Sequence, residues 1–302
     1  MIIIKLNGGL GNQMFQYALG KNLSYIKNTS FKLDISQYQK KIDIRQYGLN
    51  NFNISENFAT EEEIKKFQKH RPHFSKLGKI YDFLFSNPNK YIKEKTRNFD
   101  SKILNSNNNV YLDGFWQSEK YFSTQSGSAL GGKNIKQILR KEFTLKNQTS
   151  KSFNILNQKI SEFENNSVAI HVRHGDYSRN PKEGERHTAL SLEYYKKAIE
   201  KIDRKISNSH FFIFSDDIEW CKQHFDELNN IYFVDKNLPD YETLIAISKC
   251  KHQIIANSSF SWWGAWLNSN PNKIVIAPAQ WYNNLKINIS DRLPKNWIRI
   301  IF

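Results

Sequence analysis

Cysteine is scarce in this sequence, and its scarcity excludes two kinds of scaffold. The 302 residues contain only Cys221 and Cys250. Two cysteines cannot supply a disulfide framework, and they do not form a zinc-binding cluster. We therefore expect two reduced thiols in a cytosolic protein.

Long hydrophobic runs are also missing. No apolar stretch reaches the roughly 18–20 residues that a membrane-spanning helix needs. The opening residues, MIIIKL, lack the basic segment and the apolar stretch of a secretory signal, so we expect them to form a strand of the folded protein. These features predict a cytoplasmic protein.

Acidic residues are few relative to basic ones. The chain has 44 Lys and Arg against 29 Asp and Glu, which gives a net charge of +15. This excess favours anionic partners: nucleic acid, an anionic membrane surface or a diphosphate ligand. Basic residues cluster at 65–71, 90–97 and 133–141, as solvated helix faces or as a surface that contacts the inner face of the plasma membrane. No base-stacking aromatic sheet or groove-reading motif is present, so we predict no nucleic-acid partner.

The order of hydrophobic segments predicts an α/β protein. In the first half, a strand at 2–6, a glycine turn and a helix at 12–26 form an α/β unit, and residues 60–105 read as mostly helical. The second half alternates strands and helices, which implies a parallel sheet covered on both faces. The predicted strands are 167–172, 210–214, 231–234, 252–256 and 273–277. We predict two lobes, 1–148 and 149–302, with a ligand between them and with the last residues as candidates for packing back on the first lobe.

A glycine-rich turn separates the first strand from the first helix. Gly8, Gly9 and Gly11 let the backbone approach a ligand, and the helix start offers N–H groups to an anion. Methionine occupies the last position of a dinucleotide-binding pattern, and no Gly-Lys-Ser/Thr follows, so neither a dinucleotide site nor a P-loop is expected. The amides of Asn12 and Gln13 can bind sugar hydroxyls. The structural alternative is a tight strand–helix turn.

Polar residues follow the strand at 167–172. His171, Arg173, His174 and Asp176 lie where ligands bind in parallel sheets. A fixed guanidinium there can clamp a diphosphate and stabilise a departing group as its charge develops. A structural Arg–Asp pair is the alternative.

Two further strand ends carry polar groups. Asp216 and Asp217 suggest either a metal site or a nucleotide-binding corner, but no third metal ligand is evident, and Asp217 reads as a helix cap. The segment after the strand at 252–256 offers hydroxyls at a helix start, which make a phosphate pocket, with Ser259 or Ser261 as the expected cap and the tryptophans as core. Its candidate residues are Asn257, Ser258, Ser259, Phe260 and Ser261.

Several segments together resemble the bacterial α-1,2-fucosyltransferases of glycosyltransferase family 11. The resemblance covers nearly the whole chain, in order. It rests on GGLGNQMFQYA (8–18), FWQSEKYF (115–122), HVRHGDY (171–177), FIFSDD (212–217), SKCKHQIIANSSFSWWGAWLN (248–268) and VIAP (275–278).

The resemblance implies two Rossmann-like lobes of the GT-B kind, a GDP-fucose donor, inversion at the anomeric carbon, and no metal or other cofactor. It implies transfer to the 2-hydroxyl of a terminal galactose in a surface glycan. By position, Arg173 should bind the β-phosphate of GDP with support from His171, and Ser259 and Ser261 should line the phosphate pocket. Gly9, Gly11, Asn12 and Gln13 should face the sugar and the acceptor, and Asp216 the nucleotide.

The sequence departs from the family pattern at three places. Where the family often reads H-G-x-C after the HVRHGDY segment, this chain has His187, Thr188, Ala189 and Leu190. His174 stands where the family has a second arginine, which leaves a related donor sugar open. The family's usual Glu-Asp pair is Glu242-Thr243 in this chain, so the aspartate is missing. Glu242 is the nearest candidate for any role that this aspartate has.

The acceptor's proton needs a base, or else stabilisation of the leaving group must dominate. The candidate bases are Asp176, Glu183, Glu185 and His187. The rival functions are a transferase that uses another GDP-6-deoxyhexose and a non-catalytic glycan-binding protein. The basic surface also fits an acceptor that is linked to a membrane lipid.

Overall fold

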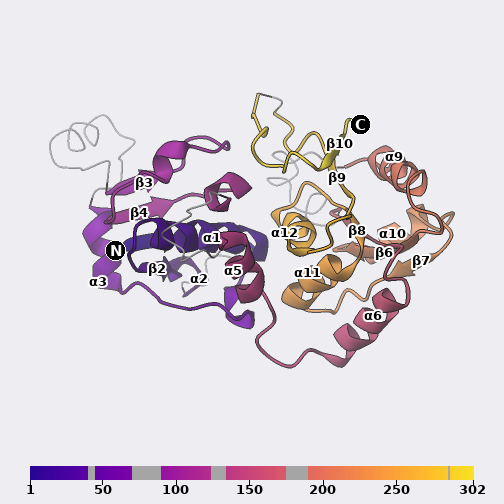
Figure 1. Ribbon diagram of the computed structural model, residues 1–302, viewed down its shortest axis with the longest axis horizontal. Coiled ribbons are helices and arrows are strands. Elements are labelled where there is room, and N and C mark those ends of the chain that lie inside the picture. Colours follow the sequence, from indigo (N-terminus) through magenta and orange to yellow (C-terminus); the bar gives the residue numbers. More distant parts are fainter. Residues whose placement is uncertain (40–44, 70–89, 124–133, 175–189, 285) are drawn as a thin grey trace. The chain divides into compact units, whose positions relative to one another are not determined.

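The computed structural model describes residues 1–39, 45–69, 90–123, 134–174, 190–284 and 286–302. The chain divides into two compact units (Figure 1). The first comprises Met1–Lys146 with Ser290–Arg292, and the second comprises Asn147–Ile289 with Leu293–Phe302. The last ten residues thus belong to the second unit, and the short segment Ser290–Arg292 before them belongs to the first.

The first unit is built on a four-stranded parallel sheet in the order β2-β1-β4-β3. Its central strand β1 begins with three fully buried isoleucines. The strands are β1 (Ile2–Lys5), β2 (Phe31–Asp34), β3 (Tyr91–Lys93) and β4 (Val110–Asp113). The helices are α1 (Leu10–Ile26), α2 (Ser36–Gln39), α3 (Glu61–Gln68) and α5 (Ile135–Glu142), with short 3-10 helices η1 (Leu49–Asn51), η2 (Ser101–Ile103) and η3 (Glu119–Phe122).

Strand β3 lies within 60–105, a stretch that the sequence predicted to be mostly helical. Only Glu61–Gln68 of the described part of that stretch is α-helical, and Tyr91–Lys93 pairs in parallel with β4 at the edge of the sheet. The ring of Tyr91 stacks on Tyr111 of β4, with centroids 4.9 Å apart. A three-residue edge strand is too short to show an alternating pattern, so its pairing partner decides its structure.

The second unit contains a six-stranded parallel sheet in the order β10-β9-β8-β5-β6-β7. Counted within the unit, this is the 3-2-1-4-5-6 order of doubly wound nucleotide-binding folds, which confirms the predicted α/β class. Its strands are β5 (Ser167–Val172), β6 (His210–Ser215), β7 (Ile231–Phe233), β8 (His252–Ile254), β9 (Val275–Pro278) and β10 (Ile298–Ile300). Its helices are α6 (Lys151–Glu162), α9 (Leu192–Asp203), α10 (Ile218–His224), α11 (Asp240–Lys249) and α12 (Ser259–Leu267).

Both faces of β5 are buried, as expected for the centre of a parallel sheet. Its valines and isoleucine pack with residues of α9 and α10 in one core cluster. Trp262 and Trp263 of α12 are fully buried, which confirms their predicted place in the core. Gly264 lets α12 approach α11, because a Cβ there would lie 2.5 Å from Cγ2 of Ile247.

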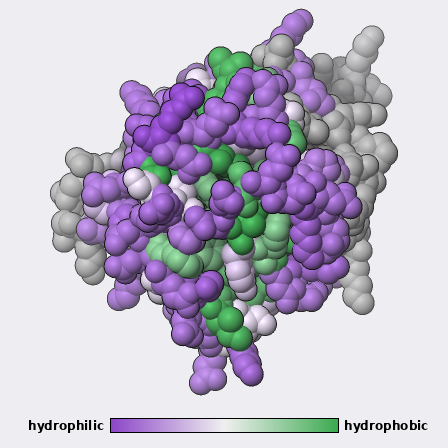
Figure 2. All heavy atoms as spheres, turned by 90° about the vertical axis from the view of Figure 1, so that its right-hand side faces the viewer, coloured by the Kyte–Doolittle hydropathy of each residue, from purple (hydrophilic) through white to green (hydrophobic). Residues whose placement is uncertain are grey.

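Hydrophilic side chains cover most of the side that faces the viewer in Figure 2, and hydrophobic ones show between them as separate patches. Among the described helices, none has the length and apolar composition needed to cross a bilayer.

Candidate functional site

The strand order of the second unit places a topological switch point beside β5. The chain runs from β5 to β6 and β7 on one side, and then crosses back to β8 on the other side of β5. Ligands of open α/β sheets bind in the crevice outside the carboxyl ends of two such strands. The polar segments that follow β5 and β8 begin at this point, and they are two of the segments that the sequence singled out.

Arg173 follows β5 and meets a carboxylate from the neighbouring strand end. Nε of Arg173 lies 3.6 Å from Oδ2 of Asp216. The other oxygen of Asp216 accepts the backbone N–H of His174 at 3.0 Å. One carboxylate thus holds both the guanidinium and the backbone beside it. The sequence predicted that Asp216 faces the nucleotide, whereas this geometry makes it a positioning residue for Arg173.

His174 is fixed to α10 by its ring. Its Nδ1 lies 3.0 Å from Oδ2 of Asp217, and its ring stacks on Trp220 with centroids 4.5 Å apart. Oδ1 of Asp217 also accepts the backbone N–H of Trp220, which confirms the predicted helix cap. His174 is therefore held by a carboxylate partner and by an aromatic ring.

His171 lies within β5 and is uncharged. Burial and, to a smaller extent, the positive charge of Arg173 lower its pKa to about 3, although Asp216 acts in the opposite direction. The ring contacts Phe260 of α12, with centroids 5.6 Å apart. Its buried Nδ1 has no hydrogen-bond partner among the described residues. A neutral imidazole at the switch point can supply one hydrogen bond to a ligand without adding charge.

The start of α12 lies across the switch point. Ser258, and not the predicted Ser259 or Ser261, is the N-cap, because its Oγ accepts the N–H of Phe260 at 3.3 Å. Ser261 is fully buried, and its hydroxyl donates to the carbonyl of Ser258 at 3.5 Å. Ser259 and Phe260 remain partly exposed at the first helical turn, where N–H groups suit an anion. Of the two serines expected to line a phosphate pocket, only Ser259 is partly exposed.

Two other predicted donor-binding residues serve the fold. Glu242 is buried, and its two carboxylate oxygens accept the backbone N–H of Ser150 at 2.6 Å and its Oγ at 2.5 Å. Glu242 of α11 thereby fixes the N-cap of α6, which corrects its predicted role. Asn257 is also buried, and its amide donates to the carbonyl of Trp281 at 3.2 Å.

The first unit has a switch point of its own between β1 and β4, because the chain leaves β1 for β2 on the opposite side. The glycine turn follows β1 there. Gly8 has φ +74, and a Cβ on it would lie 2.4 Å from Nδ2 of Asn12. Gly9 precedes α1 without any side-chain cap, and Gly11 and Asn12 lie in the first turn. Gly9 thus offers no side-chain acceptor to the first backbone N–H groups of α1.

Gln13 does not face this switch point as predicted. It is fully buried, and its Nε2 donates to the carbonyls of Gly8 and Gln46 at 3.0 and 2.9 Å. Its Oε1 accepts the N–H of Gly48 at 2.9 Å. The side-chain amide of Gln13 therefore links the glycine turn to residues 46–48.

Gln117 and Arg292 are further candidate residues for the site around Asn12, and the sequence did not reveal them. Nε2 of Gln117 donates to Oδ1 of Asn12 at 2.6 Å, and Nη1 of Arg292 donates to Oε1 of Gln117. Both side chains are buried. The three residues are 105 and 175 positions apart along the chain, so only the fold brings them together. Gln117 lay in a segment that carries the family resemblance, whereas Arg292 had no local signal.

The remaining predicted residues lie outside the described part of the chain. These are Asp176 and the alternative bases Glu183, Glu185 and His187. Among the described residues, no group of three or more His, Cys, Asp or Glu is placed to hold a metal ion.

Comparison with known proteins gives concordant results. The model of glycosyl transferase family 11 matches residues 1–301. Alpha-1,2-colitosyltransferase of Escherichia coli is 33% identical over 99% of both chains. The O-antigen biosynthesis glycosyltransferase WbnK of Escherichia coli is 32% identical over 92% of this chain and 93% of its own. A mutant of Arabidopsis thaliana FUT1 in complex with GDP has a similar fold, with a TM-score of 0.53 and 8% identity over 91% of this chain and 70% of that one.

Proposed function

The chain belongs to glycosyltransferase family 11 and is a glycosyltransferase, and from this premise we propose that it transfers a 6-deoxyhexose from a GDP-sugar to a glycan. The proposed donor is GDP-β-L-fucose, and the proposed acceptor is the 2-hydroxyl of a terminal galactose in a bacterial surface glycan such as O-antigen. Two relatives support this setting by name, as an α-1,2-transferase and as an O-antigen enzyme.

GDP-colitose is the second candidate donor. The relative that is 33% identical over 99% of both chains is named for colitose transfer. In addition, the resemblance to the family implies an arginine at the position of His174, beside the proposed phosphate site. Both donors carry the same GDP group, so the residues proposed to bind the diphosphate serve either one.

The observation that carries the proposal is the position of Arg173. It lies at the switch point of a doubly wound sheet, held by Asp216 and adjacent in the sheet to the strand that leads into α12. In the proposed reaction the bond from the anomeric carbon to the diphosphate breaks, and its electron pair leaves with GDP. The acceptor oxygen bonds to the opposite face of that carbon. Arg173 stabilises the negative charge on the departing GDP, and the N–H groups at the start of α12 add to it.

The acceptor hydroxyl must lose a proton as its oxygen bonds to the sugar. We assign this proton to Asp176, with Glu183, Glu185 and His187 as alternatives. Neutral His171 supports the diphosphate by a hydrogen bond. In the first unit, Gly9, Gly11 and Asn12 are proposed to contact the sugar and the acceptor. The location of the reaction in a cleft between the lobes stays a prediction.

Guanidinium charge and helix N–H groups supply the stabilisation that a divalent ion gives in other transferases, so we propose transfer without a metal. The test measures GDP released from GDP-fucose with and without lactose, in EDTA, and repeats it with GDP-colitose. Release that depends on the acceptor supports the proposal and identifies the donor. Failure of the protein to bind GDP would overturn it.

A further inference from the structure

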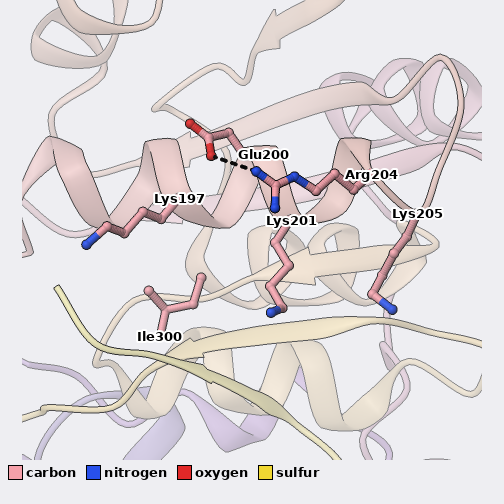
Figure 3. A pocket seen from close by; sticks show the side chains of 6 residues that line it. All are labelled: Lys197, Glu200, Lys201, Arg204, Lys205 and Ile300. Atoms are coloured by element: carbon pink, nitrogen blue, oxygen red, sulfur yellow. Dashed lines mark ion pairs between the residues drawn. The ribbon is translucent and has the colours of Figure 1, made fainter.

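A groove lined by lysines lies between α9 and β10 on the second unit (Figure 3). Its volume is about 350 Å³. Lys197 and Lys201 lie one turn apart on α9, and Lys205 lies in the turn that follows the helix. In Figure 3, Lys201 and Lys205 point toward the strand that carries Ile300, whereas Lys197 extends along the helix. The other lining residues are Glu200, Arg204 and Ile300. None of these residues belongs to the switch point where the donor is proposed to bind.

The positive charge of the groove is only partly balanced. Lys197 pairs with Glu193 at 2.6 Å, and Arg204 pairs with Glu200 at 3.7 Å. Both pairs are exposed, so each gives way readily to a stronger anion. Lys201 and Lys205 form no ion pair with the described residues. Neighbouring ammonium groups one turn apart repel one another, and an anion in the groove relieves that repulsion.

The apolar part of the groove helps to identify its occupant. Ile300 lines it. Ile301 follows β10, is not one of the lining residues, and is 83% exposed, the highest value among the large exposed hydrophobic residues described. A free anion or a nucleic-acid backbone gains nothing from an exposed isoleucine. The boundary between lipid headgroups and acyl chains accepts both lysines and an aliphatic side chain.

We propose that the α9–β10 groove docks the protein on an anionic lipid bilayer, with the three lysines against headgroup phosphates and Ile301 at the level of the upper acyl chains. The sequence pointed to basic runs at 65–71, 90–97 and 133–141 as the candidate membrane surface. We favour the groove beside α9, where Lys197, Lys201 and Lys205 line one side. This proposal does not depend on the identity of the donor sugar or on turnover.

The test is co-sedimentation of the full chain with vesicles of phosphatidylcholine and phosphatidylglycerol. The groove variant is Lys197→Gln/Lys201→Gln/Lys205→Gln. The matched control is Lys65→Gln/Lys66→Gln/Lys69→Gln, which removes the same three charges from exposed positions on and just after α3 of the first unit. Each basic residue near an anionic surface strengthens binding roughly fivefold, so the groove variant should partition about 100-fold more weakly.

Several outcomes decide the proposal. We expect the wild type to bind at low salt and to be released at high salt, the control to stay close to the wild type, and Ile301→Ser to weaken binding further. Equal losses in both triple variants would overturn it, because net charge alone would then explain binding. No binding by the wild type would also overturn it, as would groove-dependent binding of inorganic pyrophosphate that displaces the vesicles. GDP binding should be unchanged in the groove variant, which shows that the second unit is folded.

Discussion

Asp216 binds Arg173 and the residue after it at the same time. One carboxylate oxygen lies 3.6 Å from Nε of Arg173, and the other accepts the N–H of His174 at 3.0 Å. The arginine side chain keeps 18% of its surface exposed, so it is held in one orientation and stays accessible to a ligand. A preorganised cation of this kind stabilises developing charge without having to reorganise during the reaction.

Replacement of Arg173 by alanine should reduce turnover about 100- to 1,000-fold, because the departing GDP loses its main source of positive charge. Release of GDP in the presence of acceptor measures the effect, and circular dichroism checks the fold. Arg204→Ala, which removes an exposed arginine from the same unit, is the control and should leave the rate with a soluble acceptor unchanged. A rate near that of the wild type in Arg173→Ala would refute the assigned role.

Replacement of Asp216 by asparagine should lower kcat by about 10- to 100-fold, because the guanidinium loses the charge that orients it. A positioning role predicts a smaller change in GDP affinity than in kcat. Asp217→Asn is the matched neighbour. It weakens the cap of α10 and the contact to His174, so it should affect thermal stability more than rate. Equal effects of the two substitutions on kcat would contradict a positioning role for Asp216 that Asp217 does not share.

Replacement of His174 by arginine should be tolerated and should tighten GDP binding several-fold. Arginine retains an anionic partner in Asp217 and can stack on Trp220 as histidine does. Titration with GDP measures the affinity, and rates with GDP-fucose and GDP-colitose show whether donor preference changes. Weaker binding of GDP would mean that the histidine ring itself makes the better contact.

Replacement of Glu242 by alanine should destabilise the protein by about 2 kcal/mol, because two partly buried donors of Ser150 lose a charged acceptor. The activity of the fraction that remains folded should be unchanged. Urea unfolding measures the loss, and Glu193→Ala, at an exposed position of α9, should cost under about 1 kcal/mol. Strong loss of GDP affinity at full stability would restore Glu242 to the donor site.

Stability should fall in mild acid. Burial lowers the pKa of His171 to about 3 and that of His252 to about 4, below the ordinary 6.5. The unfolded chain takes up these protons below pH 6.5, whereas the folded chain does not until lower pH. The free energy of unfolding therefore decreases as pH falls from 6.5 toward 4, by up to about 1.4 kcal/mol per pH unit for each residue.

Urea unfolding at several pH values measures this slope. His252→Gln removes one of the two groups, and its slope should be shallower than that of the wild type, although the variant loses some stability at neutral pH. His224 is the control position, since it lies at the partly exposed end of α10. An unchanged slope in His252→Gln would contradict the assignment.

The sequence predicted most of the second unit because each of its central strands is a buried run between helices. The bounds of β5, for example, agree with the predicted 167–172. Strands β3 and β10 were missed because each is a three-residue edge strand whose partner decides its structure. Motif position identified Arg173 and the start of α12, but it could not tell ligand-facing groups from structural ones. Gln13 and Glu242 look like binding residues in the sequence, and only their backbone partners show that they hold the fold.

The path of the chain limits how the two units can be exchanged between related enzymes. Residues 290–292 belong to the first unit although the sequence on both sides belongs to the second. A chimera with a single crossover near residue 146 would therefore combine Asn12 and Gln117 of one parent with Arg292 of the other. To transplant the first unit intact, a protein engineer needs a second cassette that carries residues 290–292 from the same parent.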